Sequence, residues 1–329
     1  MDPLRVVLLA LLQGIAELFP VSSLGHTVII PGLLDWGDLL RSDTFLPLVV
    51  TLHLGTAIAL LTFFWRDWVK LLRGGARVLI AGRFTPDVDP QGYGRQLALI
   101  VVGTVPAGLI GVLFQTRLEA LFGAPILAAA FLCANGAVLF AAERLTRRQR
   151  RIQAAIQAAI QAAASTSERG GVTLGATALQ GSVREIPYGQ DVGPDRSLND
   201  VSFAQAALIG AAQALALFPG ISRSGVTMIA GLAIGLSHES AARFSFLLAT
   251  PIILAAGLLE IPKLFGEGAQ TLLLAGIGGL LAGIAAYLSV RFLMRYFETK
   301  SLDPFAYYCL VAGLLAFLYF AAKMLNLIP

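Results

Sequence analysis

The stretch QGIAELFPVSSLGH, residues 13–26, places a carboxylate, an amide, hydroxyls and an imidazole in an otherwise apolar chain. Gln13 and Glu17 are four residues apart, so a helix presents both side chains on one face. Pro20 ends that helix, and the serines and glycine after it favour a turn that leads into a new helix start. The stretch therefore predicts a broken helix with polar groups on one side.

A second stretch, QALALFPGISRSGVT at residues 213–227, repeats this order of residue types. Both stretches run from a glutamine through Leu-Phe-Pro into a turn that contains serine and glycine, and the second one adds Arg223. The first stretch supplies a carboxylate and a histidine, and the second supplies a guanidinium, whose geometry matches phosphate oxygens. We therefore expect the two broken helices to meet and to hold a phosphate group.

The composition indicates an integral membrane protein. Of the 329 residues, 57% are hydrophobic and 13% are charged, whereas soluble domains carry about 25% charged residues. The apolar runs have the length of helices, while barrel strands are shorter and alternate in polarity. Basic residues lie in the connections between these runs, which argues against nucleic-acid binding. Cys133 and Cys309 lie inside apolar runs and indicate neither a disulfide nor a metal framework.

These runs predict an all-α polytopic membrane protein with six transmembrane helices and two re-entrant hairpins. Each hairpin consists of two apolar segments too short to cross a hydrocarbon core of about 30 Å, joined by a polar turn. The hairpins are expected at residues 4–36 and 204–236. Full spans are expected at residues 45–65, 97–114 and 125–142, and at residues 244–262, 271–290 and 305–325. Residues 1–142 and 204–329 then form two repeats of inverted topology.

Two polar connections interrupt the apolar runs. Residues 66–95 are expected to form a basic loop, and residues 143–203 a longer basic loop on the cytoplasmic side. Within the longer loop, the low-complexity segment IQAAIQAAIQAAA at residues 152–164 favours a helix with one apolar stripe. That helix is expected to rest on the membrane or on the protein, and docking of a partner is the alternative.

The lysines and arginines in the connections predict the orientation of the chain. Connections 66–95, 143–203 and 291–304 carry six, eight and three of them, whereas 37–44, 115–124 and 263–270 carry one each. The first three connections are therefore expected to face the cytoplasm. Both termini and a cleft at the first hairpin are then expected to face outside.

Ionisable residues inside a bilayer are functional candidates, because they are costly there unless they are paired or hydrated. Glu17 is expected to be a general acid or base or a metal ligand, or else a helix-end glutamate bonded to a hydroxyl. His26 is expected to attack phosphorus or to carry a proton, or to be a structural histidine. Arg223 is expected to clamp an anion, or else to anchor a loop to lipid headgroups. His53 is either a core histidine or a supporting group for the same cavity.

Both turns precede a short helix, and the start of a helix adds backbone donors and a favourable dipole for an anion. The expected phosphate-binding residues are Ser22, Gly25, Ser222, Ser224, Gly225 and Thr227. The sequence contains no P-loop, dinucleotide-binding fingerprint, H-E-x-x-H or cysteine-based metal motif. The missing P-loop argues against a pump driven by nucleotides.

At these motifs the sequence resembles the undecaprenyl-diphosphate phosphatase family, also called bacitracin resistance proteins. The resemblance covers the box at Gln13 and Glu17, the segment PVSSLGH at residues 20–26 and the segment PGISRSGVT at residues 219–227. It extends to HLGT at residues 53–56, FSFLLATP at 244–251 and DPFAYY at 303–308. It therefore runs nearly from end to end.

The resemblance implies hydrolysis of the terminal phosphate of a C55 isoprenyl diphosphate at the outer face of the bacterial plasma membrane. This recycles the cell-wall carrier lipid and confers bacitracin resistance. It also implies a divalent cation, Mg²⁺ or Ca²⁺, and a catalytic set of Glu17, Ser23, His26 and Arg223. Gln13 and Glu17 are the implied metal ligands, although Gln13 replaces a glutamate of many relatives, and Leu24 replaces a common threonine. The 145–200 insert is longer than the corresponding loop of those relatives.

The main alternative is a transporter or flippase for an anion or a phosphorylated lipid, because inverted repeats and broken helices around an anion site are transporter traits. Release of inorganic phosphate from an isoprenyl diphosphate distinguishes the two. The nucleophile stays open among His26, Ser23 and water. Oligomeric state, isoprenyl chain length and the purpose of the insert are not determined by the sequence.

Overall fold

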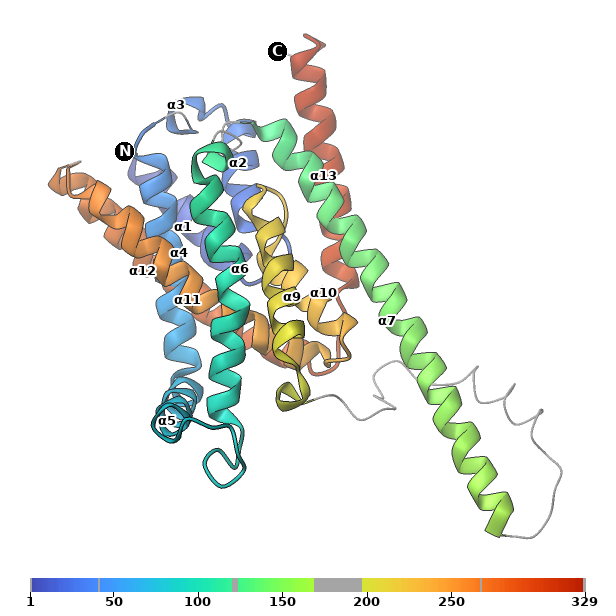
Figure 1. Ribbon diagram of the computed structural model, residues 1–329. Coiled ribbons are helices and arrows are strands. Elements are labelled where there is room, and N and C mark those ends of the chain that lie inside the picture. The colour runs from blue at the N-terminus through green and yellow to red at the C-terminus, as the bar shows by residue number, and fades with distance from the viewer. Residues whose placement is uncertain (1, 41, 120–123, 169–196, 267, 328–329) are drawn as a thin grey trace.

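In the computed structural model, which describes residues 2–40, 42–119, 124–168, 197–266 and 268–327, the chain is a bundle of helices (Figure 1). The described residues contain six helices that are long and apolar enough to cross a membrane. They are α4 (Phe45–Phe63), α6 (Tyr93–Glu119), α7 (Pro125–Glu168), α11 (His238–Leu264), α12 (Ala269–Tyr296) and α13 (Asp303–Met324). The expectation of an all-α polytopic membrane protein is confirmed. Most spans begin or end several residues beyond the apolar runs, because helices continue into the polar flanks.

Both stretches that contain the Leu-Phe-Pro motif form broken helices. The first consists of α1 (Pro3–Ala16) and α2 (Ser23–Leu33), and the second of α9 (Phe203–Gln213), the 3₁₀ turn η2 (Ala214–Leu217) and α10 (Arg223–Ala233). Each of these helices is too short to span a hydrocarbon core of about 30 Å. Two further short elements are α3 (Gly37–Leu40) and η1 (Leu198–Asp200). Re-entry of the hairpins into a bilayer stays a prediction.

The two halves of the chain pack against each other reciprocally. Helix α1 of the first half packs on α12, and α9 of the second half packs on α6, while α4 contacts α11 and α7 contacts α13. Glycines allow the backbones to come close at these crossings. A Cβ on Gly210 would lie 2.0 Å from the carbonyl oxygen of Gly103, and one on Gly14 would lie 2.3 Å from that of Ala282. Each half therefore completes the packing of the other, and their inverted orientation in a membrane stays a prediction.

The expectation that residues 66–95 form a loop is wrong for their first half. Helix α5 (Trp65–Ala81) starts directly after α4, from which it is separated only by the non-helical Phe64, and it ends at Gly82 in the left-handed conformation. The segment is amphipathic, and its apolar residues fall at helical spacing between the basic ones. Charge alone therefore does not distinguish a basic loop from an amphipathic helix.

The boundary expected after residue 142 is also absent, because α7 continues as one helix to Glu168. The segment at residues 152–164 is helical as expected, but it extends the preceding span instead of forming a separate element (Figure 1). No proline or glycine follows Gly136 within α7, and alanine, glutamine and arginine are good helix formers. Of the rest of the expected loop, residues 169–196 lie outside the described residues, and residues 197–203 contain η1 and the start of α9.

Asn135 on α7 joins the turns of the two broken helices. Its side chain is buried, its Nδ2 donates to the carbonyl of Pro20 at 3.1 Å, and its Oδ1 accepts from the backbone N–H of Ser222 at 3.0 Å. The turns also bond directly, since the N–H of Gly220 donates to Oγ of Ser22 at 3.2 Å. These hydrogen bonds fix the two turns against each other and so position the polar residues that they carry.

Candidate functional site

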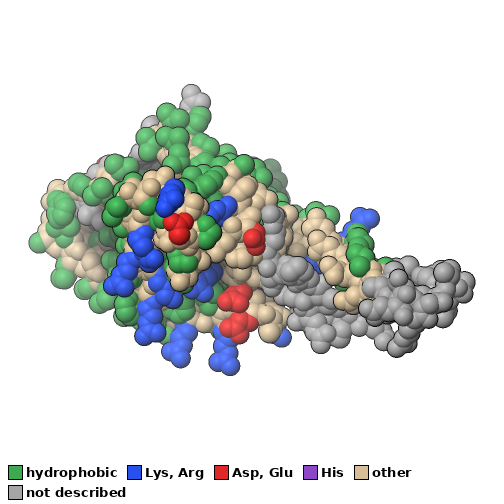
Figure 2. All heavy atoms as spheres, turned by 60° about the horizontal axis from the view of Figure 1, so that its bottom comes forward, with side chains coloured by type: hydrophobic (Ala, Val, Ile, Leu, Met, Phe, Trp, Pro, Cys, Tyr) green, Lys and Arg blue, Asp and Glu red, His purple; other side chains and the backbone are tan. Residues whose placement is uncertain are grey.

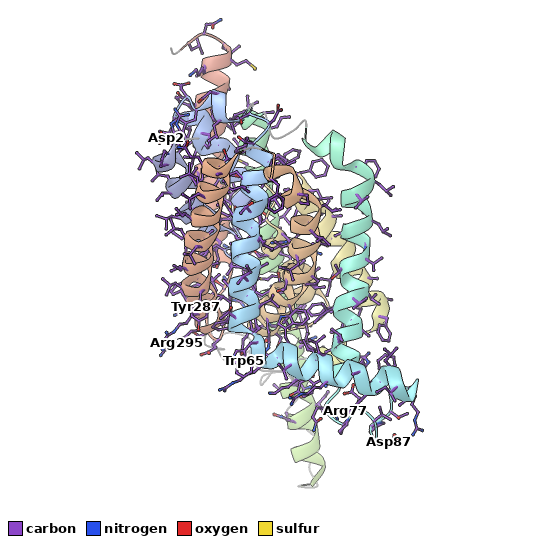
Figure 3. All side chains as sticks on the ribbon, turned by 90° about the vertical axis from the view of Figure 1, so that its left-hand side faces the viewer. Asp2, Trp65, Arg77, Asp87, Tyr287 and Arg295 are labelled. Atoms are coloured by element: carbon purple, nitrogen blue, oxygen red, sulfur yellow. The ribbon has the colours of Figure 1, made fainter. Side chains whose placement is uncertain are left out.

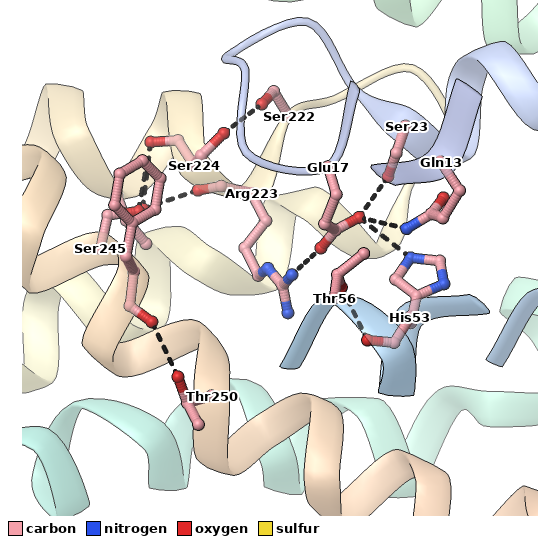
Figure 4. Close-up of polar contacts among 12 residues, drawn as sticks. Gln13, Glu17, Ser23, His53, Thr56, Ser222, Arg223, Ser224, Ser245 and Thr250 are labelled. Carbon is pink, nitrogen blue, oxygen red and sulfur yellow. Dashed lines mark hydrogen bonds and ion pairs between the residues drawn. The ribbon is translucent and has the colours of Figure 1, made fainter. Parts of the chain in front are cut away.

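Glu17 lies at the centre of the polar side chains, just after α1 (Figure 4). Its side chain is buried, with an exposed fraction of 4%. Oε1 accepts a hydrogen bond from Nη2 of Arg223, which comes from the second broken helix. Oε2 accepts from Oγ of Ser23 and, at 2.8 Å, from Nε2 of Gln13, and it lies 3.2 Å from Nε2 of His53. One buried carboxylate thus collects donors from both halves of the chain.

His53 lies close enough to Glu17 to exchange a proton with it. Nδ1 of His53 lies 2.8 Å from the carbonyl oxygen of Val49, which only accepts hydrogen bonds, so Nδ1 carries a proton. Nε2 of a neutral ring with this tautomer has no proton to offer the carboxylate. Nε2 lies 3.2 Å from Oε2 of Glu17, so a proton taken up by either group would lie between the two. Such a pair is suited to giving a proton to, or taking one from, a group beside it.

A cavity of about 250 Å³ lies beside this carboxylate, between the two turns and helices α4, α6 and α11. Its polar lining consists of Glu17, Ser22, Ser23, His53, Gln213, Ser222 and Arg223. Its other walls are mostly aliphatic, for example Leu46, Val50, Ile252 and Ile253. The first residues of α2 and α10 border the same space, so free backbone N–H groups of two helix starts favour an anion there. The cavity therefore suits a molecule with an anionic head and an apolar body.

Ser23 is the hydroxyl best placed for reaction. It is the first residue of α2, it lines the cavity, and its hydroxyl donates to Oε2 of Glu17. A hydroxyl bonded to a carboxylate that can accept its proton is the arrangement of an activated nucleophile. The other oxygen of that carboxylate is held by Arg223, so the orientation of Glu17 is fixed from both sides.

His26 does not line this cavity. Its Nδ1 lies 2.7 Å from the carbonyl oxygen of Ser22, its Nε2 lies 2.7 Å from the hydroxyl of Tyr308, and its ring stacks on that tyrosine with centroids 5.6 Å apart. Because a carbonyl only accepts, Nδ1 donates to Ser22. Ser22 has a φ of +66°, in the left-handed region that serine rarely adopts. The imidazole thus stabilises an unusual turn directly before Ser23.

Two of the six expected phosphate-binding residues, Ser22 and Ser222, line the cavity. The four that do not are Gly25, Ser224, Gly225 and Thr227. The backbone N–H groups of the two glycines instead donate to the serine at the start of their own helix, each at 3.1 Å. These bonds are N-terminal caps, so their role in this structure is to hold the helix starts.

The two expected hydroxyls of α10 also point into the scaffold. Ser224 donates to the carbonyl of Phe19 in the first turn at 3.1 Å, and Thr227 donates to the carbonyl of Arg223 at 2.7 Å and bonds to Ser245. A helix exposes only part of its first turn to a space at its end, so residues beyond the first position turn toward neighbouring elements.

Gln213 is a site residue that sequence reasoning missed. It lies at the end of α9, it is 2% exposed, and it lines the cavity. No described residue forms a hydrogen bond with its Oε1 or its Nε2. A buried amide without a partner costs free energy, so this side chain is poised for a ligand. In the sequence, Gln13 has Glu17 four residues later, whereas Gln213 has Leu217, but only its burial shows that the amide has no partner.

The residues expected to bind a metal are Glu17 and Gln13. Within the described part of the chain, no group of three or more His, Cys, Asp or Glu side chains has the geometry of a metal site. However, Oε1 of Gln13 is buried without a hydrogen-bond partner among those residues, next to the carboxylate that its Nε2 contacts. An amide oxygen and a carboxylate are hard ligands of the kind that Mg²⁺ and Ca²⁺ accept, with substrate phosphates completing the shell.

Comparison with known proteins gives matches along nearly the whole chain. The family described as "Bacitracin resistance protein BacA" matches residues 6–315. The chain is 44% identical to "Undecaprenyl-diphosphatase 2" of Frankia alni over 345 aligned positions, covering 97% of this chain and 98% of the relative. It is 46% identical to "Undecaprenyl-diphosphatase" of Mycolicibacterium paratuberculosis, covering 94% of each chain. It is 43% identical to "Undecaprenyl-diphosphatase 2" of Chromobacterium violaceum, covering 97% and 99%.

These matches include both broken helices, and therefore Glu17 and Arg223, which meet in the cavity. The coverage leaves no large part of the relatives unmatched. Similarity along nearly the whole length, to the family and to individual members, shows that this chain belongs to the BacA family of bacitracin resistance proteins.

Proposed function

We propose that this protein is a membrane phosphatase that hydrolyses undecaprenyl diphosphate to undecaprenyl phosphate and inorganic phosphate. The observation that carries the proposal is the buried Glu17 carboxylate, bonded to Ser23 and Arg223 at the polar end of a cavity with aliphatic walls. The names of the relatives support the substrate. The reaction returns the carrier lipid for cell-wall synthesis and removes the diphosphate form, which accounts for bacitracin resistance in the family name.

Different parts of the cavity bind different parts of the substrate in this proposal. The first isoprenyl units lie against the aliphatic walls, and the diphosphate lies at the polar end. There Arg223 offers a planar fork of donors, and the starts of α2 and α10 offer backbone N–H groups. These donors are fixed before substrate enters, so they stabilise the charge that develops on the transferred phosphoryl group without reorganisation.

Ser23 is the nucleophile in this proposal. Its hydroxyl proton passes to Glu17 as Oγ forms a bond to the terminal phosphorus, and the bond from phosphorus to the bridging oxygen breaks. Undecaprenyl phosphate leaves with the electron pair of that bond. Water then gives a proton to Nε2 of His53 as its oxygen attacks the phosphoserine. Ser23 recovers its own proton from Glu17 as inorganic phosphate leaves, and the proton on His53 passes to solvent.

A divalent cation, Mg²⁺ or Ca²⁺, belongs to the proposal as a cofactor. Glu17 and Oε1 of Gln13 would hold it, and it would neutralise charge on the substrate phosphates when bound. Nη2 of Arg223 contacts Oε1 of Glu17, and the other N–H groups of the guanidinium are available to the phosphate.

We further propose that the protein resides in the bacterial plasma membrane with the cavity and both termini facing outside. Support comes from Figure 1, in which the two termini lie at the same end of the bundle, and from the basic connections, which gather toward the other end. Basic residues are retained on the cytoplasmic side of a membrane.

Single substitutions in the Glu17–Arg223 pair test the reaction itself. Purified Glu17→Gln and Arg223→Lys proteins should lose at least about 100-fold in kcat for phosphate release from an isoprenyl diphosphate, because each removes a preorganised group at the reacting phosphorus. Glu298→Gln and Arg295→Lys, which change exposed residues at the end of α12, serve as matched controls. Substrate binding without phosphate release by the unmodified protein would instead establish the transporter or flippase.

The nucleophile can be read from a trapped intermediate. Rapid acid quenching during turnover of substrate labelled in its terminal phosphate should leave label on Ser23, as an acid-stable phosphoserine that is absent from Ser23→Ala. His26→Gln should slow turnover by loosening the turn, yet keep the label. An acid-labile label that disappears in His26→Gln would transfer the role to the histidine, and turnover without any label would indicate direct attack by water.

Replacing Gln213 distinguishes a role in substrate binding from a role in the stability of the fold. Gln213→Leu should lower kcat/KM by about tenfold or more, mainly through KM, because a hydrogen bond to a charged phosphate is lost. Its thermal midpoint should stay the same or rise, since leucine removes an unpaired buried amide. Gln205→Leu, on the same helix but outside the cavity lining, is the control for activity. A lower midpoint with unchanged KM would show that the amide is structural.

Orientation is testable at Leu24, which lines the cavity. In a variant without Cys133 and Cys309, Leu24→Cys should react with a membrane-impermeant maleimide in intact cells. Arg77→Cys, at the opposite end, should react only after the membrane is permeabilised. Protection of position 24 until permeabilisation contradicts the proposed orientation.

A further inference from the structure

Helix α5 presents three distinct faces. Its buried residues, Leu71, Gly74 and Val78, lie on one side and pack toward α6. Its basic residues are Arg66, Lys70, Arg73 and Arg77, which follow one another at intervals of four, three and four. With about 3.6 residues per turn, this spacing aligns all four on one stripe along the helix. The helix therefore has a continuous basic face that is separate from the face on which it packs.

The position of α5 relative to the spans is unusual for a connection. Figure 3 shows it running across the ends of the long helices instead of along them, with Trp65 next to α4 and Arg77 toward its far end. A helix that runs across the ends of transmembrane spans lies along the membrane surface. Two contacts hold it there. A Cβ on Gly74 would lie 2.6 Å from the backbone nitrogen of Gly94, and Asp67 pairs with Arg243 at 2.6 Å.

The basic face is free of carboxylates. All four side chains are exposed, and none of them forms an ion pair with a described residue. Figure 2 shows lysines and arginines gathered on this end of the molecule. Two of the cations lie over aromatic rings, Arg66 over Trp65 at 5.4 Å and Lys70 over Tyr93 at 5.7 Å. Because a ring carries no net charge, these contacts do not neutralise the two cations.

An exposed apolar strip runs beside the basic stripe. Trp65, Leu72, Leu79 and Ile80 are 55%, 57%, 84% and 88% exposed. Water is a poor solvent for so large an apolar surface, whereas the boundary between headgroups and acyl chains accommodates it. An apolar strip next to a row of cations is the pattern of helices that lie in a membrane interface.

We propose that α5 is a binding surface for anionic phospholipid headgroups of the leaflet along which it lies. Its apolar strip enters the acyl region, and its four cations contact lipid phosphates. The complementary charge identifies the partner, because zwitterionic headgroups offer the stripe no net negative charge. The proposal is independent of the phosphatase reaction, since no residue of α5 lines the catalytic cavity.

Trp65 offers a local reporter for lipid selectivity. With Trp36 and Trp68 replaced by phenylalanine, its fluorescence in vesicles is compared between brominated phosphatidylglycerol and brominated phosphatidylcholine at equal mole fraction. We expect the phosphatidylglycerol to quench with a relative binding constant about two- to fivefold higher. The quadruple variant R66Q/K70Q/R73Q/R77Q should reduce this ratio to one. High salt should also reduce it, because salt screens exposed charges.

Two controls make the result specific. Substitution of four exposed cations elsewhere at the same end, R148Q/R291Q/R295Q/K300Q, should keep the preference at Trp65. A reporter with Trp36 alone, near the opposite end, should be unaffected by neutralising α5. Circular dichroism and phosphate release establish that each variant is folded. The proposal is overturned if both lipids quench Trp65 equally in the protein with its four basic residues intact. It is also overturned if the preference for phosphatidylglycerol survives in the quadruple variant.

Discussion

The ion pair between Glu17 and Arg223 is the interaction on which the rest of the structure depends. A carboxylate with 4% exposure is tolerable only when its charge is paired and its lone pairs are bonded. The guanidinium that pairs with it lies about two hundred residues later, in the other broken helix. Neither half of the chain therefore provides a stable environment for its own charge. Pairing the charges requires the two turns to meet, and the same meeting creates the cavity.

Several contacts besides the ion pair serve this meeting of the turns. Asn135 bonds to both turns from α7, and Oγ of Ser22 accepts N–H groups from both. His26 donates to the carbonyl of Ser22, a residue with a positive φ. Such a conformation costs of the order of 1–3 kcal/mol and persists where surrounding bonds over-determine it. The backbone directly before Ser23 is thus held in place from three directions, which is what a reactive hydroxyl requires.

We propose that the protein contacts lipid in two physically different ways. At the catalytic cavity, aliphatic walls lead to a polar end, so one lipid can lie partly in the protein with its phosphates at Arg223. At α5, an apolar strip and a basic stripe lie side by side on the exposed surface and suit many lipids in exchange. Binding in the cavity selects one substrate by burial and geometry. Binding at α5 depends only on the average charge of the leaflet.

The sequence alone determined the class of fold, the two broken helices and the principal charged residues, because these follow from local properties: apolar run length, proline breaks, and the four-residue spacing of Gln13 and Glu17. Tertiary structure alone decided which side chains face the cavity. His26 and His53 look alike in the sequence, yet the stacking of His26 on Tyr308, 282 residues later, turns it away, whereas α4 carries His53 to Glu17. Gln213 became notable only when its burial left its amide unpaired. The direction of a side chain depends on contacts between distant segments, and no local pattern contains them.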